Sequence, residues 1–216
     1  MNKLEVPFLP LLDKNSSIEE VSAELDSLEK NIIDNIPWPV YSYKPSVKFA
    51  LGYSNECLFI KFYVAEEAIR AKFRNINDPV YKDSCVEFFI SFNEEEKYYN
   101  LEFNCLGTCR LGFGEGRENR TLVPEALIRK IRHSVSLQKT ALPNGNQVTS
   151  WELTLIIPAE VFPYHEILSF KGIRARGNFY KCGDELPRPH YLTWNNINAA
   201  EPNFHLPEYF GEVQFV

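Results

Sequence analysis

The sequence predicts a mainly β protein, an antiparallel β-sandwich with one N-terminal helix and short helical turns. Short segments that alternate apolar and polar residues recur along most of the chain, one long helical pattern lies near the N-terminus, and proline-rich links separate the segments. The 216 residues, 44% of them hydrophobic, are enough to bury a sizeable core. We therefore expect a single domain over residues 1–216, in which residues 1–35 form an N-terminal strand and helix extension.

The N-terminal extension contains a short strand and the main helix. The strand is predicted in the run LEVPFL, residues 4–9. Ser17 and Glu20 then form a capping-box pair ahead of apolar residues at helical spacing, which predicts a helix from Ile18 to about Lys30. Prolines on both sides of Trp38 favour an extended segment that leads into the first hairpin.

A central hairpin is predicted between residues 81 and 104. With a four-residue loop at 94–97, Asn93 lies opposite Tyr98, which sets the register, so that Glu87 faces Asn104. The alternation gives a core face, made of Val86, Phe88, Ile90, Phe92, Tyr99, Leu101, Phe103 and Cys105. The other face is a polar row, made of Glu87, Phe89, Ser91, Asn100, Glu102 and Asn104. This row is either the floor of a polar binding site or a solvated sheet face.

Further strands are predicted on both sides of this hairpin. Segments 47–53 and 58–64 form a first hairpin, and segments 131–139 and 148–157 form another around the turn at 142–146. The glycine-rich segment 107–120 lacks the lysine of a phosphate loop, so we expect a mobile loop there. A strand near 173–179 and a closing strand at 211–216 complete the sandwich.

The net charge limits the classes of partner, and the cysteine content indicates the redox state of the thiols. The net charge of -6 and the pI near 5.4 argue against a nucleic-acid or anionic-membrane partner. The five cysteines form no CxxC pair, and their odd number favours reduced, buried thiols. The first residues lack the apolar run of a signal peptide and no segment is long enough to span a bilayer, so we expect a cytoplasmic chain as written. The oligomeric state is left open.

Tyr81 and Trp194 are the best candidates for a carbohydrate site. Both lie in polar surroundings outside the predicted core faces, and flat aromatic side chains pack well against the apolar face of a sugar ring. The alternative is that each is a buried hydrophobe that anchors a loop. Trp151 alternates with polar neighbours in its strand and is therefore predicted in the core.

Five runs of the sequence carry a resemblance to a known family. They are VYKDSCVEFFISF, YYNLEFNCLGT, WELTLIIPAEVF, FKGIRARGNFYKCGDELPRPHYLTWNNI and PNFHLPEYFGEVQF. In order and spacing these runs resemble the family 9 carbohydrate-binding modules, specifically the short single-domain group called family 9-like, from gut-type bacteria. The resemblance implies a DOMON-like, immunoglobulin-like sandwich that binds the end of an oligosaccharide or polysaccharide between two aromatic rings and has no catalytic activity.

The resemblance also implies the residues of the site. The first stacking aromatic of the family precedes a D-S-x-V-E stretch, which corresponds to Tyr81, and the second corresponds to Trp194. Tyrosine replaces the usual tryptophan at the first position, and its smaller ring should still stack. The expected hydrogen-bonding residues are Glu87, Asn100, Glu102 and Asn104, with Arg176 and Asn195 at the border of the site.

Two other function classes compete with carbohydrate binding. A glycoside hydrolase needs two facing carboxylates, but Asp83, Glu87 and Glu102 are predicted side by side on one strand pair. We therefore expect no enzyme activity. A scaffold or interaction domain that has lost sugar binding is the main alternative.

No cofactor or metal site is predicted from motifs. The four histidines are dispersed without zinc-ligand spacing, and a His/Met haem site is excluded because the only methionine is Met1. Structural calcium occurs in some members of the family that the chain resembles. The carboxylates that offer oxygens for it are those of Asp78, Asp83 and Asp184, without a contiguous calcium loop.

Overall fold

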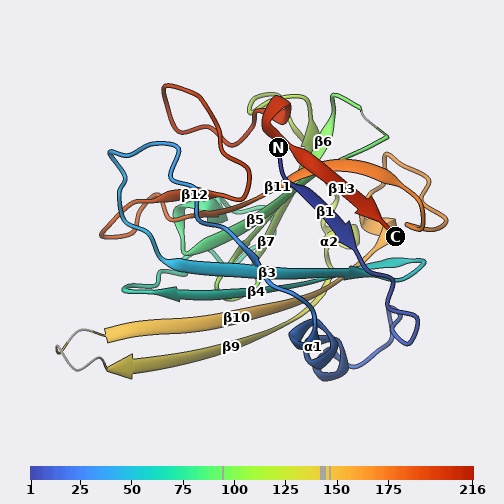
Figure 1. Cartoon of the computed structure of the whole chain (residues 1–216), viewed down its shortest axis with the longest axis horizontal. Helices are drawn as coiled ribbons and strands as arrows, with labels where there is room; N and C mark the ends of the chain where they lie inside the picture. Colours follow the sequence, from blue (N-terminus) through green and yellow to red (C-terminus); the bar gives the residue numbers. More distant parts are fainter. Residues whose placement is uncertain (94, 142–144, 146) are drawn as a thin grey trace.

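Two β-sheets pack face to face in the computed structural model, which describes residues 1–93, 95–141, 145 and 147–216 (Figure 1). The first sheet has the strand order β1 (Lys3–Val6), β13 (Gly211–Phe215), β11 (Arg174–Cys182), β5 (Cys85–Phe92), β6 (Tyr98–Asn104), β7 (Cys109–Gly114) and β8 (Thr121–Leu122), and β12 (Tyr191–Thr193) pairs with β11. The second has the order β2 (Asn31–Ile32), β3 (Ser46–Tyr53), β4 (Cys57–Glu66), β10 (Gln147–Pro158) and β9 (Arg132–Ala141). The predicted β-sandwich is therefore confirmed.

The remaining elements are short helices that connect the strands. They are α1 (Ile18–Ser27), α2 (Glu125–Ile128) and the single 3₁₀ turns η1 (Val80–Lys82), η2 (Ala159–Val161) and η3 (Pro207–Tyr209). Among the described residues, no helix is both long and apolar enough to cross a membrane. The predicted turn at 142–146 lies outside the described residues except for Gly145, as does residue 94 of the predicted loop at 94–97.

The main hydrophobic core fills the space between the sheets. Phe179 of β11 lies at its centre, where its ring stacks on Phe49 of β3 at 3.7 Å and on Phe88 of β5 at 4.4 Å between centroids. All eight residues predicted on the core face of the central hairpin are buried in this cluster, as is Trp151. These predictions are confirmed because strict alternation leaves one side of each strand to face the opposite sheet.

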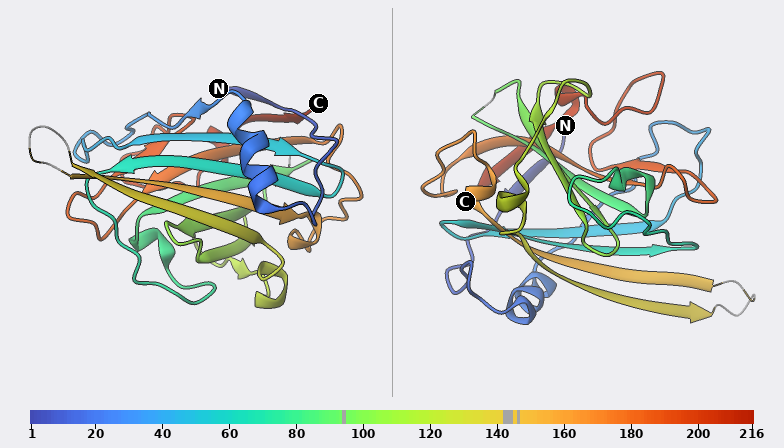
Figure 2. Two further views of the ribbon diagram at one scale, coloured as in Figure 1. Left: turned by 90° about the horizontal axis from the view of Figure 1, so that it is seen from below. Right: turned by 180° about the vertical axis from the view of Figure 1, so that it is seen from behind.

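Helix α1 covers the outer face of the five-stranded sheet (Figure 2). Its apolar side chains Val21 and Leu25 pack on Ala50, Phe59 and Ile156, whose side chains point away from the main core. These positions on the outer face of the sheet can be apolar because the helix covers them. The sandwich is therefore three layers deep at this end.

The start of α1 agrees with the predicted capping box. The Ser17 hydroxyl accepts a hydrogen bond from the Glu20 N–H at 3.1 Å, and the Glu20 carboxylate accepts one from the Ser17 N–H at 3.0 Å. The helix ends at Ser27, three residues before the predicted end. Lys30 folds back at this end, and its Nζ donates hydrogen bonds to carbonyl groups of the last turn, including those of Leu25 and Asp26.

Ser17→Ala should lower the free energy of unfolding by about 1 kcal/mol, because the Glu20 N–H loses the Ser17 hydroxyl as its acceptor. Urea denaturation followed by tryptophan fluorescence measures this change. Ser17→Asp keeps an acceptor at the cap and should stay within about 0.5 kcal/mol of the wild type. A loss in Ser17→Ala that is no larger than the loss in Ser17→Asp would show that the acceptor at the cap does not stabilise the helix.

A second apolar cluster lies on the outer face of the eight-stranded sheet, under loops from three parts of the chain. Its largest members are Trp38, Phe89, Tyr98, Tyr180 and Phe204. The indole N–H of Trp38 donates to the carbonyl of Ala199 at 2.8 Å, which joins the segment before β3 to the loop after β12. Consequently the outer face of this sheet is partly covered, and its polar row is not freely solvated.

Candidate functional site

A pocket of about 440 Å³ lies on the outer face of the eight-stranded sheet, next to the second apolar cluster. Its floor comes from the strands β5, β6, β7 and β11, whose alternate residues fill the main core. Its walls come from η1, from the segment between β7 and β8, and from the residues after β11 and β12. The floor residues are Glu87, Asn100, Glu102, Arg110, Gly112 and Cys182.

The register of the central hairpin differs from the prediction by two residues. Glu87 lies opposite Glu102, whereas the predicted partner of Glu87 was Asn104, which lies opposite Cys85. The cause is the turn, which begins earlier than expected. The N–H of Glu95 donates to the carbonyl of Phe92, and Asn93 has a positive φ of 55°. Because the shift is even, both predicted faces are kept, but two carboxylates become neighbours on the floor.

The two carboxylates on the floor are buried, with 3% of Glu87 and 4% of Glu102 exposed. Burial raises the pKa of Glu102 to about 7, and burial together with the charge of Glu102 raises the pKa of Glu87 well above its usual range. Burial also raises the pKa of Asp184, in the pocket wall, to about 6. The site can therefore hold protons that exposed carboxylates would release.

One oxygen atom on the floor has no partner among the described residues. Glu102 Oε1 accepts a hydrogen bond from Asn100 Nδ2 at 2.6 Å, but its Oε2 accepts none. Leaving a buried acceptor unpaired costs free energy, and such atoms are usually satisfied by a ligand or by water. Glu102 Oε2 is therefore a buried acceptor at the floor of the pocket that no described group satisfies.

Arg120 holds the amide of Asn100 in place. Its Nε donates to Asn100 Oδ1 at 2.8 Å, and its remaining nitrogens donate to the carbonyls of Tyr98 and Gly116 at 2.7 and 2.8 Å. The guanidinium carbon lies 4.3 Å from the centre of the Tyr98 ring. Since Oδ1 of Asn100 faces Arg120, its Nδ2 faces Glu102, and the orientation of the floor is fixed.

Sequence reasoning missed Arg110 and Arg120 because the glycine-rich segment was expected to be a mobile loop. That expectation is wrong for its first half, which is strand β7. A period of two was visible there, with Cys109, Leu111 and Phe113 on one side. Gly112 belongs to the opposite face of this strand, which lines the pocket. A Cβ atom there would lie 2.8 Å from Asn100 Oδ1, so the position requires glycine.

Aromatic side chains form part of the pocket wall. Tyr81, predicted from the sequence, lies in η1 and is half-buried at the edge of the pocket. Tyr191 of β12 and Phe204 also line it, with their rings edge to face at 6.1 Å. Phe204 is nearly buried and stacks on Tyr180 at 4.2 Å, so Tyr81 and Tyr191 offer the more accessible rings.

The predicted position of Trp194 in the site is wrong. Its indole is 5% exposed and packs in the main core, edge to face with Phe49 at 6.1 Å and Phe179 at 5.8 Å. Alternation explains the error, because Leu192 and Trp194 point between the sheets while Tyr191 points into the pocket. Trp194 therefore does not face Tyr81 across a sugar-sized space.

Three further predicted residues do not line the pocket. The amide of Asn104 donates to Asp83 Oδ2 at 3.0 Å and so supports the segment that carries Tyr81. Arg176 donates to the carbonyl of Pro207 at 2.7 Å, and Asn195 Oδ1 accepts from the N–H of Asn2 at 2.7 Å. Their polar groups hold loops and the N-terminus, so the polar row continues beyond the site.

The carboxylates considered for calcium are mostly used by the protein itself. Asp78 accepts from the backbone of Asn75, and Asp83 accepts from the backbone of Lys72 and pairs with Arg70. Asp184 lies in the pocket wall. In the described part of the chain, the His, Cys, Asp and Glu side chains that come together as a group of three are those of Cys85, Glu87 and Cys182.

The sequence matches carbohydrate-binding family 9 over residues 19–215. It is similar to the structure of a candidate carbohydrate-binding protein from Bacteroides uniformis, with 32% identity, 99% of each chain covered and a TM-score of 0.90. No curated protein matches the sequence.

The fold is also similar to two structures of a family 9 carbohydrate-binding module from Caldicellulosiruptor kristjanssonii. One is in complex with glucose, with 13% identity, 100% of this chain and 96% of that chain covered, and a TM-score of 0.58. The other is in complex with cellotriose, with 14% identity, 99% and 93% covered, and a TM-score of 0.55.

The family match spans nearly the whole chain, and the protein from Bacteroides uniformis is similar over the full length of both chains. The resemblance found in the five sequence runs is thus confirmed. The chain belongs to carbohydrate-binding family 9.

Proposed function

We propose that the protein binds the end of an oligosaccharide or polysaccharide in the pocket above Glu87, Asn100 and Glu102, without cleaving it. The observation that carries the proposal is the buried Oε2 of Glu102, which has no partner in the described part of the chain, beside an amide held rigidly by Arg120. Sugars present several hydroxyl groups that both donate and accept, which suits a floor of carboxylates and amides.

The volume of the pocket supports a small ligand such as the end of a sugar chain. A volume of about 440 Å³ is in the range of small-molecule sites. The rings of Tyr81 and Tyr191 supply apolar area at the wall for the carbon-bound hydrogens of a pyranose. Glucose and cellotriose are bound by the family members from Caldicellulosiruptor kristjanssonii, so glucose and cello-oligosaccharides are the first probes.

The position of the two carboxylates supports binding without cleavage. Glu87 and Glu102 are cross-strand neighbours on one floor, whereas a glycosidase places its acid and its base or nucleophile on either side of the scissile bond. We expect labelled cello-oligosaccharides to be recovered intact after incubation with the protein. Release of shorter products that a Glu102→Gln variant fails to give would establish a hydrolase instead.

The direct test is isothermal titration of the chelator-treated protein with glucose, cellobiose and cellotriose, followed by a glycan array. Tyr81→Ala should weaken binding by about tenfold or more, because stacked aromatic residues are frequent hot spots. Tyr164→Ala, at an exposed ring outside the pocket, should bind as the wild type does. The absence of any bound glycan would favour a scaffold domain that has lost the site.

Gly112→Ala tests the floor without removing a polar group. The new Cβ would displace the amide of Asn100, so we expect at least tenfold weaker binding with little change in secondary structure. Gly114→Ala is the matched control in the same strand, because its Cβ would meet Arg120 at an ordinary contact distance of 3.5 Å. Equal affinities of the two variants would place the sugar away from Asn100.

A further inference from the structure

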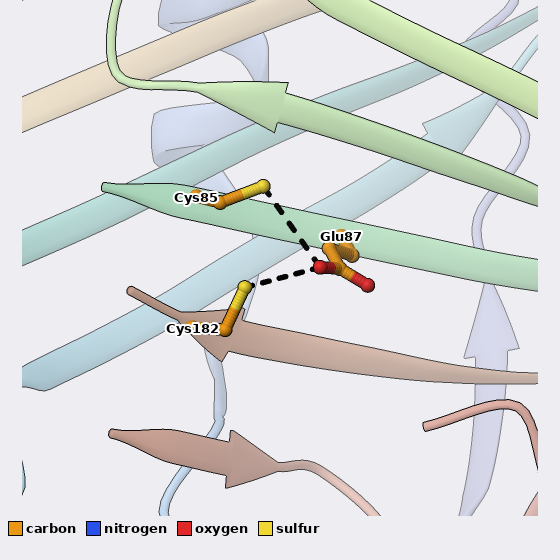
Figure 3. A group of neighbouring side chains, drawn as sticks. All are labelled: Cys85, Glu87 and Cys182. Atoms are coloured by element: carbon orange, nitrogen blue, oxygen red, sulfur yellow. Dashed lines mark hydrogen bonds between the residues drawn. The ribbon is translucent and has the colours of Figure 1, made fainter. Parts of the chain in front are cut away.

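Two cysteines and a glutamate converge beside the floor of the pocket. Cys85 of β5 and Cys182 of β11 are cross-strand partners, and Glu87 is two residues from Cys85 on the same face (Figure 3). The Cys182 Sγ lies 3.1 Å and the Cys85 Sγ 3.9 Å from Glu87 Oε1, and all three ligand atoms lie within 4.8 Å of one another. Strand pairing thus fixes three donor atoms in one small volume.

We infer that Cys85, Glu87 and Cys182 form a binding site for a thiophilic divalent cation of the zinc class. Two thiolates and one carboxylate form a donor set that zinc prefers and that calcium and magnesium do not. Zinc–sulfur bonds of about 2.3 Å at a tetrahedral angle separate two sulfur atoms by about 3.8 Å. Sulfur atoms that lie within 4.8 Å of each other can therefore bind one zinc ion after small rotations of their side chains.

The surroundings leave a fourth position for water or another ligand. Cys182 and Glu87 line the pocket, so an ion between the three side chains would be reached from it, whereas Cys85 is fully buried beneath. Three protein ligands with one open position is a common arrangement for zinc. The ion would also supply positive charge next to the buried carboxylates of Glu87 and Glu102.

Binding exchanges protons for the ion. Both cysteines are free thiols in the structure, and burial raises the pKa of Cys85 to about 12 and that of Cys182 well above its usual value. One divalent ion therefore replaces the two thiol protons and any proton on Glu87, and these protons pass to solvent. No oxidant or reductant takes part.

The metal site and the proposed sugar site share Glu87, but they can be tested separately. Metal binding is measured on reduced full-length protein without sugar, and sugar binding is measured in the presence of a chelator. Either function can consequently fail alone.

The test is titration of the chelator-treated protein with cobalt(II), whose bonds to thiolates give a charge-transfer absorption band, followed by displacement with zinc. Cys85→Ala and Cys182→Ala should lose the band and bind at least about 100-fold more weakly, since even outer partners of a metal site contribute 10–100-fold. Cys57→Ala is the matched control, because Cys57 is an equally buried free thiol in the other sheet. It should bind as the wild type does.

A measurement on the wild type covers the event that the alanine variants do not fold. At a urea concentration at which the free thiols react, zinc should slow the alkylation of Cys85 and Cys182, as mapped by peptide mass spectrometry, more than that of Cys57. The inference is overturned if cobalt gives no band, if the two alanine variants bind as tightly as the wild type, or if zinc protects neither cysteine. A disulfide between Cys85 and Cys182 in protein purified without reductant would also overturn it.

Discussion

Lys181→Met should lower the free energy of unfolding by about 3–5 kcal/mol, the largest stability loss that we predict for a single substitution. Lys181 Nζ of β11 lies 3.0 Å from Glu66 Oε2 of β4, and both side chains are completely buried between the sheets. Glu66 Oε1 also accepts a hydrogen bond from the Trp151 indole at 2.7 Å. Without the lysine, Glu66 is left as a buried charge without a counterion.

His190 completes this buried group as a neutral acceptor. Its Nε2 lies 2.9 Å from Lys181 Nζ, and its Nδ1 lies 2.9 Å from the carbonyl of Arg188, to which it donates. Burial, followed by the charge of Lys181, lowers the pKa of His190 to about 3. The imidazole therefore stays uncharged at pH 7 and adds no second positive charge beside the lysine.

The double variant Lys181→Met/Glu66→Gln is the control for the buried charge. Glutamine keeps an acceptor for the Trp151 indole, so we expect this variant to regain most of the stability, to within about 1–2 kcal/mol of the wild type. Urea denaturation at pH 7 measures all three proteins. A single variant that loses less than about 1 kcal/mol, or a double variant that is less stable than the single one, would contradict the assignment.

Glu102→Gln should weaken sugar binding by more than about tenfold and stabilise the protein at pH 8. Its neutral amide lacks the charge-assisted acceptor proposed for a sugar hydroxyl, and such hydrogen bonds contribute about 1.5–3 kcal/mol. The same substitution removes a buried carboxylate whose Oε2 has no partner among the described residues. We therefore expect Glu102 to favour sugar binding while it lowers the stability of the protein without sugar.

The pH dependence gives the sign of the stability effect. The pKa of Glu102 is raised from 4.5 to about 7 in the folded protein, so the folded state holds its proton more tightly than the unfolded chain. The stability that this provides is present below pH 4.5 and is lost as the pH rises through 7, which amounts to about 3 kcal/mol. Among the charged groups nearby, Arg110 and Arg120 oppose the rise in the pKa of Glu102, and Asp184 adds to it.

Urea denaturation of the chelator-treated wild type and Glu102→Gln at pH 5 and pH 8 tests this. The difference between the two proteins should grow with pH in favour of the variant. A constant difference would mean that Glu102 ionises as an exposed carboxylate does. Titration of the same two proteins with cellotriose at pH 8, in buffer without urea, measures the loss of sugar binding.

Strand faces could be predicted from the sequence, whereas pairing partners could not. A face depends on alternation within one strand, so the core side of β5 and β6 was predicted correctly from Val86 to Cys105. The partner of Glu87 depends on where the turn begins, and one tight turn at Asn93 moved that partner by two residues. The register therefore needed information on turn geometry that alternation does not contain.

The candidate site residues divide in a similar way: those in or just before the hairpin come together in the pocket, and Trp194 does not join them. Tyr81, Glu87, Asn100 and Glu102 lie together in the pocket, because they belong to the hairpin or directly precede it. Trp194 was assigned from its polar neighbours in the sequence, but the strand β12 turns its side chain into the core. Choosing between Tyr191 and its neighbours required knowledge of which face of a three-residue strand points to the main core.

The pairing of β1 with β13 bears on how recombinant fragments of this protein should be designed. The family match begins at residue 19, yet Leu4 and Val6 are buried in the main core and Lys3–Val6 hydrogen-bonds along Glu212–Phe215. A fragment trimmed to the matched range would strip β13 of its outer neighbour and expose a row of unpaired N–H and C=O groups beside apolar side chains. Such an edge recruits other chains, so the shortened protein should self-associate more strongly than the full-length protein.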